Sequence, residues 1–339
     1  MYRRLYAGDH PAIEMDLNNL AFIRQHMGRI AEAEPLFQQA LEMSGRLYTG
    51  DHPSVARNLN NLAHARWQLG QQDQAERGLE SALEMNRRLY GDDHPLVAAG
   101  LNNLAYVRAG MGRPEDAESL YQQALAIKER LFKGDHPDVA MGMNNLANVR
   151  EELGRVAEAD SLYQKSLEMF QRLYSGDHPQ VALGFNNLAS LRERQGKLEE
   201  AELLFRRSLE MEERLFPGDH PQVARFAGNL AGVLLGLGRE AEALALFERA
   251  LGMEQRLFPG DHPDVAWCLG DVARGLAALD RFPEAHARAQ EAVDMAGRIL
   301  PEGHPTRKMC DDTLAELKRN PEATAPTLPP STSPPPGGG

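Results

Sequence analysis

A His-Pro dipeptide recurs along the chain at a fixed interval of 42 residues, and this regularity constrains the fold more than any other feature. Two further landmarks keep the same step: an Asn-Asn pair, and an Arg-Leu-Tyr or Arg-Leu-Phe triplet that becomes Arg-Ile-Leu before the last dipeptide. Strict periodicity of this length is the signature of stacked supersecondary units, so we expect a repeat architecture with no single central core. The histidines of the dipeptide are His10, His52, His94, His136, His178, His220, His262 and His304.

Each unit predicts two helices, as residues 54–90 illustrate. Proline fits the first turn of a helix because its missing N–H has no partner there, so the first helix should begin beside Pro53 and end at Gly70. The aspartate before each His-Pro should suit the positive end of that helix. The second helix should run to Tyr90. Small residues such as Ala63 and Ala82 mark places where the helices approach closely. Where Ser208 replaces such an alanine, we expect its hydroxyl to bond the preceding turn.

The order Leu-Asn-Asn-Leu-Ala over residues 59–63, followed by Gly70, Ala75 and Ala82, resembles the tetratricopeptide repeat. The 42-residue period with Gly-Asp-His-Pro before each unit is similar to the repeats of kinesin light chains and their bacterial relatives. This resemblance implies an all-α fold, a right-handed superhelical α-solenoid of helix-turn-helix repeats. In one departure, arginine stands where the family usually has an aromatic residue, at Arg24, Arg66, Arg108, Arg150 and Arg192.

The repeat phase predicts four segments. Residues 1–11 match the end of a partial repeat, residues 12–305 form seven repeats, and residues 306–319 read as a polar capping helix of the kind solenoids need. Residues 320–339 are rich in proline and glycine and should be disordered. The partial first unit leaves open that the chain is a fragment of a larger protein.

The resemblance also implies a concave groove lined by the first helices, with the first asparagine of each pair facing the ligand and the second bonding backbone between repeats. An amide can both donate to and accept from a peptide backbone. The predicted ladder is Asn18, Asn60, Asn102, Asn144 and Asn186. Four residues further along lie Phe22, His64, Tyr106 and Asn148, and seven further along lie Trp67, Glu151 and Glu193.

These positions predict a linear ligand segment with an apolar anchor and basic residues, because the first half of the set is aromatic and the middle is acidic. A structural alternative remains open for each group. The asparagines can bond neighbouring helices, Trp67 and Tyr106 can be packing residues, and the two glutamates can belong to a solvated helix face.

Composition narrows the remaining classes of function. The net charge of −12 disfavours binding to nucleic acid and to anionic membranes. The chain lacks an apolar run of about 20 residues and its only cysteines are Cys268 and Cys310, which favours the cytoplasm. Zinc holds nitrogen ligands at about 2.0–2.1 Å. Equivalent histidines one unit apart are separated by a whole helix pair, so we expect no metal site.

The sequence contains no catalytic motif in a meaningful context, so we expect no enzyme activity, no cofactor and no small-molecule substrate. The leading hypothesis is a scaffold that binds an extended peptide segment of a partner protein. The alternative hypothesis is a structural or regulatory tetratricopeptide domain of a larger signalling protein with an ATPase, protease or kinase module.

Overall fold

The computed structural model describes residues 8–319, and the regular secondary structure in this part of the chain is entirely helical. The predicted all-α fold is therefore confirmed. The tail 320–339 and residues 1–7 of the predicted partial repeat lie outside the described residues. The helices are α1 (Pro11–His26), α2 (Ile30–Leu47), α3 (Pro53–Gln68), α4 (Gln72–Tyr90), α5 (Pro95–Gly110), α6 (Pro114–Leu131), α7 (Pro137–Glu152), α8 (Val156–Leu173), α9 (Pro179–Arg194), α10 (Leu198–Leu215), α11 (Pro221–Gly236), α12 (Glu240–Leu257), α13 (Pro263–Ala278), α14 (Phe282–Ile299) and α15 (Pro305–Arg319).

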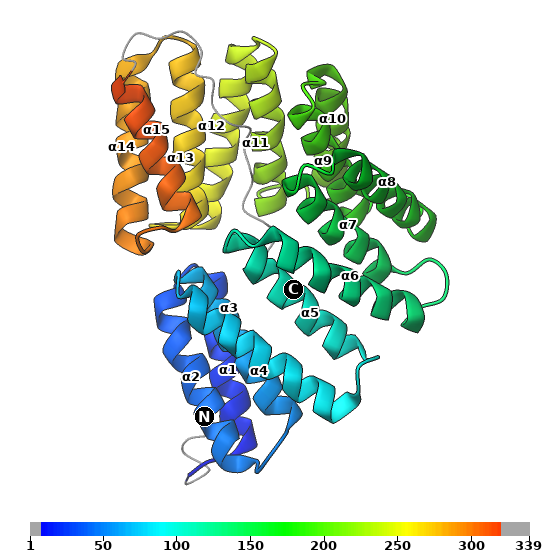
Figure 1. Ribbon diagram of the computed structural model, residues 1–339. Coiled ribbons are helices and arrows are strands. Elements are labelled where there is room, and N and C mark those ends of the chain that lie inside the picture. Colours follow the sequence, from blue (N-terminus) through cyan, green and yellow to red (C-terminus); the bar gives the residue numbers. More distant parts are fainter. Residues whose placement is uncertain (1–7, 320–339) are drawn as a thin grey trace. The chain divides into compact units, whose positions relative to one another are not determined.

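Consecutive helices pack as hairpins, and each hairpin packs on the next through its second helix (Figure 1). The chain divides into two compact units, with the boundary between Ala159 and Asp160 inside α8. In the first unit α1 packs on α2, α2 on α3, and so on to α7; in the second the same order runs from α9 to α14. Helix α15 packs on both α13 and α14. Among residues 8–319, no helix combines the length and apolarity that crossing a membrane requires.

The His-Pro dipeptide starts the first helix of each hairpin by a combination of capping and ring stacking. At α7, Pro137 occupies the first turn and His136 Nδ1 accepts a hydrogen bond from the backbone N–H of Asp138 at 3.1 Å. The imidazole stacks on Phe132 with 3.6 Å between ring centroids. All eight histidines of the repeated dipeptide accept the same backbone hydrogen bond. The histidine is therefore the N-cap of each of these helices.

The aspartate before each histidine does not simply face the helix end, as the sequence suggested. It binds the arginine of the triplet 37 residues later, as in the bidentate pair of Arg88 with Asp51 at 2.6 and 2.9 Å. This pair ties the start of a hairpin to its end. Equivalent pairs are Arg46–Asp9, Arg130–Asp93, Arg214–Asp177, Arg256–Asp219 and Arg298–Asp261.

The small residues lie at helix contacts, as predicted. Ala63 and Ala75 are 1% and 0% exposed, respectively, and aromatic side chains such as Phe205 and Phe247 fill the space between hairpins. The Ser208 hydroxyl, however, donates to the carbonyl of Ala182 on α9 at 2.8 Å instead of bonding its own helix. A small polar residue here joins two helices of one hairpin because the close approach brings a neighbouring carbonyl within reach.

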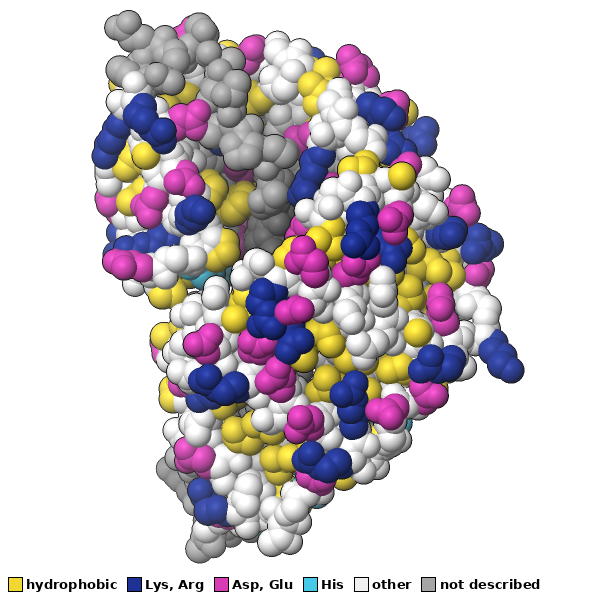
Figure 2. All heavy atoms as spheres, viewed as in Figure 1, with side chains coloured by type: hydrophobic (Ala, Val, Ile, Leu, Met, Phe, Trp, Pro, Cys, Tyr) yellow, Lys and Arg dark blue, Asp and Glu magenta, His cyan; other side chains and the backbone are white. Residues whose placement is uncertain are grey.

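The arginine that replaces the family's aromatic residue forms ion pairs between hairpins. Arg108 on α5 donates to Glu76 at 2.8 Å and to Glu80 at 2.7 Å, both on α4. The matching pairs are Arg66–Glu34, Arg150–Glu118 and Arg192–Asp160. Leu234 and Leu276 occupy this position on α11 and α13. Figure 2 accordingly shows basic and acidic side chains interspersed over the face in view.

Candidate peptide-binding face of the first helices

The predicted ligand-binding residues lie on α1, α3, α5 and α7 in the first unit and on α9 in the second. We call the side of the first helices that carries these repeat positions the first-helix face. Its asparagines form hydrogen bonds from helix to helix: Asn103 Nδ2 donates to Asn60 Oδ1 at 2.9 Å, for example. The same bond joins Asn61 to Asn18, Asn145 to Asn102 and Asn229 to Asn186. The second asparagine thus bonds a side chain of the preceding hairpin.

The ladder asparagines differ in their accessibility. Asn18, Asn144 and Asn186 are only 8%, 5% and 6% exposed, whereas Asn60 and Asn102 are half-buried. Each amide has two N–H donors and an oxygen that accepts two hydrogen bonds. The helix-to-helix bond uses one acceptor position of the first asparagine, so its Nδ2 donors are not used by the ladder. Asn60 and Asn102 therefore combine a structural bond with an amide group that a ligand can reach.

Trp67 and Tyr106 come together as an edge-to-face pair between α3 and α5. Their ring centroids lie 5.9 Å apart, and a side-chain hydrogen bond joins them. The indole lies so close to Gly110 that a Cβ atom there would overlap the ring. Burial raises the pKa of the Tyr106 hydroxyl. Both aromatic residues remain half-buried, so they pack between hairpins and still offer apolar surface on the first-helix face.

His64 lies about one helical turn before Trp67 on α3 and is held by amide side chains. Gln25 Nε2 lies 2.7 Å from His64 Nδ1 and also donates to Gln68 Oε1. Burial lowers the pKa of His64, and the charge of His26 lowers it further. The imidazole is therefore neutral near pH 7, with Nδ1 accepting from the Gln25 amide.

Helix α1 exposes several large apolar side chains, among them the predicted Phe22. Phe22 is 55% exposed and packs edge-on against His26 with 4.2 Å between ring centroids. Ile23 is also 55% exposed and Leu20 43%. The residues equivalent to Leu20 on the later first helices, such as Leu62 at 2%, are buried. At the Leu20 position the later first helices pack on the preceding second helix, as Leu62 does in one cluster with Phe37.

The remaining predicted residues, an asparagine and two glutamates, are divided between the two units. Asn148 is exposed and Glu151 half-buried on α7, while Glu193 is half-buried on α9. Burial raises the pKa of Glu193 to about 7, against the opposing charges of Arg274 and Arg194. Arg274 lies four residues after the ladder position on α13, yet the sequence analysis did not select it. The missed signal was the pair Gly270-Asp271, which replaces Asn-Asn in that helix.

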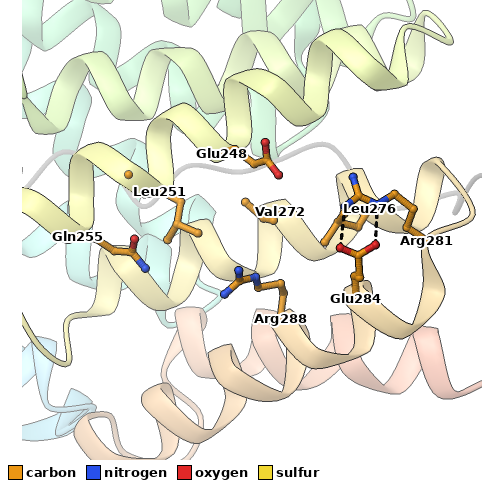
Figure 3. A pocket seen from close by; sticks show the side chains of 9 residues that line it. Glu248, Leu251, Gln255, Val272, Leu276, Arg281, Glu284 and Arg288 are labelled. Atoms are coloured by element: carbon orange, nitrogen blue, oxygen red, sulfur yellow. Dashed lines mark hydrogen bonds and ion pairs between the residues drawn. The ribbon is translucent and has the colours of Figure 1, made fainter.

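A pocket of about 250 Å³ lies away from the ladder, between α12, α13 and α14 (Figure 3). Its apolar lining comes from Leu251, Val272 and Leu276. Arg281 and Glu284 lie at one end and bind each other at 2.6 and 2.8 Å. Charged and polar side chains, among them Glu248, Gln255 and Arg288, complete the lining.

Comparisons with known proteins agree with this geometry. A family model described as tetratricopeptide repeat matches residues 12–88, 60–130, 138–214 and 218–298. No curated protein sequence matches the chain significantly. Among solved structures, the kinesin light chain-like repeats of Podosopora anserina share 24% identity over 61% of this chain and 98% of that one, with a TM-score of 0.52. BtubC (BKLC) from P. vanneervenii shares 26% identity over 60% of this chain and 81% of that one, again with a TM-score of 0.52.

A bacterial structure extends the similarity over more of the chain. The Rap protein solved in complex with competence and sporulation factor covers 91% of this chain and 98% of that one, with a TM-score of 0.52 at 12% identity. At this identity the match concerns the fold alone. Since the family model covers most of residues 12–298, the chain belongs to the tetratricopeptide repeat family.

Proposed function

We propose that this chain is a non-catalytic scaffold that binds an extended segment of a partner protein along its first-helix face. The observation that carries the proposal is the ladder of half-buried amides beside an aromatic pair in the first unit, at Asn60, Asn102, Trp67 and Tyr106. Amides satisfy a peptide backbone without selecting its side chains, and aromatic rings supply an apolar anchor.

The spacing of the first helices suits an extended ligand. Packed helices lie about 8–10 Å apart, and an extended peptide advances about 3.3 Å per residue. Each ladder position would then meet every third ligand residue. The acidic residues Glu151 and Glu193 favour a segment that also contains lysine or arginine. The Rap protein with its bound competence and sporulation factor supports the proposal, because it shares the fold.

The ladder offers a matched pair of variants that separates binding from stability. Asn102→Ala removes the amide proposed to meet the ligand, and Asn145→Ala removes only its helix-to-helix partner. Both break the same hydrogen bond and should cost about 1 kcal/mol of folding stability. On an array of random dodecapeptides, Asn102→Ala should weaken the bound peptides by about tenfold and Asn145→Ala by much less. Equal effects of the two variants would show that the ladder is only structural.

The alternative hypothesis, that the chain is a structural or regulatory tetratricopeptide domain of a larger signalling protein with an ATPase, protease or kinase module, stays a prediction.

A further inference from the structure

Helix α1 is the first helix of a hairpin, and no second helix precedes it among residues 8–319. The first helices α3, α5, α7, α11 and α13 each pack on the second helix of the preceding hairpin. The positions that form this contact are open on α1. Ile23 is 55% exposed, whereas Val107, at the same position on α5, is 2% exposed. Leu20 is 43% exposed, whereas its equivalent Leu104 is 3% exposed. We call Leu20, Ile23 and Arg24 the α1 edge.

The arginine of the α1 edge lacks a carboxylate that the equivalent arginines bind on the preceding hairpin. Arg150 binds two carboxylates, Glu118 of the preceding hairpin at 3.0 Å and Glu158 of its own hairpin at 3.3 Å. Among the described residues, Arg24 pairs only with Glu32 of its own hairpin, at 3.5 Å. A guanidinium has five N–H donors and can bind a second carboxylate. The α1 edge therefore combines two uncovered apolar side chains with a cation that can accept another acidic partner.

The contacts between hairpins show which kind of helix covers such an edge. On the second helices, the acid that binds the arginine stands three residues before a large apolar side chain that is at most 7% exposed. These pairs are Glu34 and Phe37, Glu76 and Leu79, Glu118 and Tyr121, and Asp160 and Tyr163. Phe37 lies in one cluster with Leu62 and Ala65 of α3, which occupy the positions of Leu20 and Ile23. A helix with this acid and apolar pair therefore matches the α1 edge in both charge and apolarity.

We propose that the α1 edge docks an amphipathic helix of a partner protein that carries an acidic residue three positions before a leucine or an aromatic residue. The acid binds Arg24, and the apolar side chain covers Leu20 and Ile23. A second copy of the chain offers no such helix among its described residues, because the apolar member of each pair is already buried. The α1 edge shares no residue with the predicted peptide-binding set, so it is a separate interaction surface.

Helix α4 supplies a probe for this surface, because α5, on which it packs, has leucine, valine and arginine at the three positions of the α1 edge. The α4 peptide is a synthetic, amidated copy of residues 72–90 with fluorescein at its N-terminus. A second peptide, the lysine peptide, differs only by Glu76→Lys and Glu80→Lys, the two residues that bind Arg108 in the chain. Fluorescence anisotropy measures the affinity of each peptide for the full chain.

Two variants of the full chain change the α1 edge, and a third is the control. Ile23→Lys places a charge in its apolar part, and Arg24→Glu reverses the charge of its cation. The matched control is Leu203→Lys on α10, because Leu203 is 54% exposed and lies outside the α1 edge. None of the three side chains is buried, so each variant should fold, and circular dichroism checks this.

We expect the wild type and the control to bind the α4 peptide equally, and Ile23→Lys to bind it about tenfold more weakly. Arg24→Glu should lose about fivefold with the α4 peptide and recover with the lysine peptide, because the charges are then exchanged across the contact. The proposal is overturned if the α4 peptide does not bind the wild type, or binds Ile23→Lys equally well. A wild-type dimer in light scattering that Ile23→Lys dissociates would also overturn it, because a second copy would then cover the α1 edge.

Discussion

The burial of Glu254 on α12 predicts that the stability of the second unit depends on pH. Its side chain is 3% exposed, and Oε2 has no hydrogen-bond partner in residues 8–319. Burial raises its pKa from 4.5 to about 8, and the negative charge of Asp264 adds to the shift. A carboxyl group whose pKa is raised by folding destabilises the folded state as the pH rises, because the unfolded chain ionises first. The second unit should therefore lose stability between pH 5 and pH 8.

The magnitude follows from the size of the pKa shift. At about 1.4 kcal/mol per pKa unit, the cost of keeping Glu254 buried grows by roughly 3 kcal/mol between pH 5 and pH 8. Glu254→Gln has nearly the same shape and does not ionise. Over this range the free energy of unfolding of the variant should fall by roughly 3 kcal/mol less than that of the wild type, because Glu193 and Asp271, whose pKa values are also raised, remain in both proteins.

Urea unfolding monitored by tryptophan fluorescence measures this difference. The chain has only two tryptophans, Trp67 in the first unit and Trp267 in the second, so a Trp67→Phe background reports the second unit. Glu199→Gln, at an exposed position, should follow the wild-type curve. Parallel curves for the wild type and Glu254→Gln, within about 0.5 kcal/mol, would refute the reasoning, because Glu254 would then be solvated in the folded protein.

Three further predictions concern contacts made by the repeat. Gly110→Ala would drive a methyl group into the Trp67 ring, so the first unit should lose about 1–3 kcal/mol of stability and the Trp67 emission should shift. His136→Ala removes a helix cap and a stacked ring, and urea unfolding should show a loss of about 1 kcal/mol. Arg88 lowers the pKa of Asp51, so this pair stabilises the fold above a pH of about 4 and ceases to do so as the pH falls through the folded-state pKa. The thermal midpoints of the wild type and Asp51→Asn should therefore differ at pH 6 and converge near pH 2.

The local features of the fold follow from the sequence, because they depend on residues a few positions apart. The spacing from Phe132 to His136 and Pro137 lies within one turn between helices, so capping could be inferred. The pair of Asp51 and Arg88 contains two residues of the repeated motif, but their contact is 37 positions apart. It depends on how the second helix returns beside the start of the first, which periodicity alone does not determine.

The candidate site was less predictable for the same reason. The positions of Asn60 and Asn102 came from the resemblance to a family, but their bonds to the asparagines of the next hairpin came from the structure. Trp67 was selected, whereas its contact with Gly110, 43 residues later, was not. The burial of Glu254 was also not foreseen, because equivalent positions on the second helices carry residues as different as Ser44 and Phe170.

The 42-residue period distinguishes residues with a structural role from candidates for ligand selection. Every hairpin packs on its neighbour in the same way. A residue that recurs every 42 residues therefore forms a contact that recurs in every hairpin. The capping histidines and the ladder asparagines follow this rule: His136 caps its own helix, and Asn145 bonds Asn102 of the preceding hairpin. Asp271 and Arg274 break the step, and Oδ1 of Asp271 and Nε of Arg274 form no hydrogen bond among the described residues. Substituting Asn102 should weaken the binding of peptides of different sequence to a similar extent, because its amide is proposed to meet the peptide backbone and not the side chains.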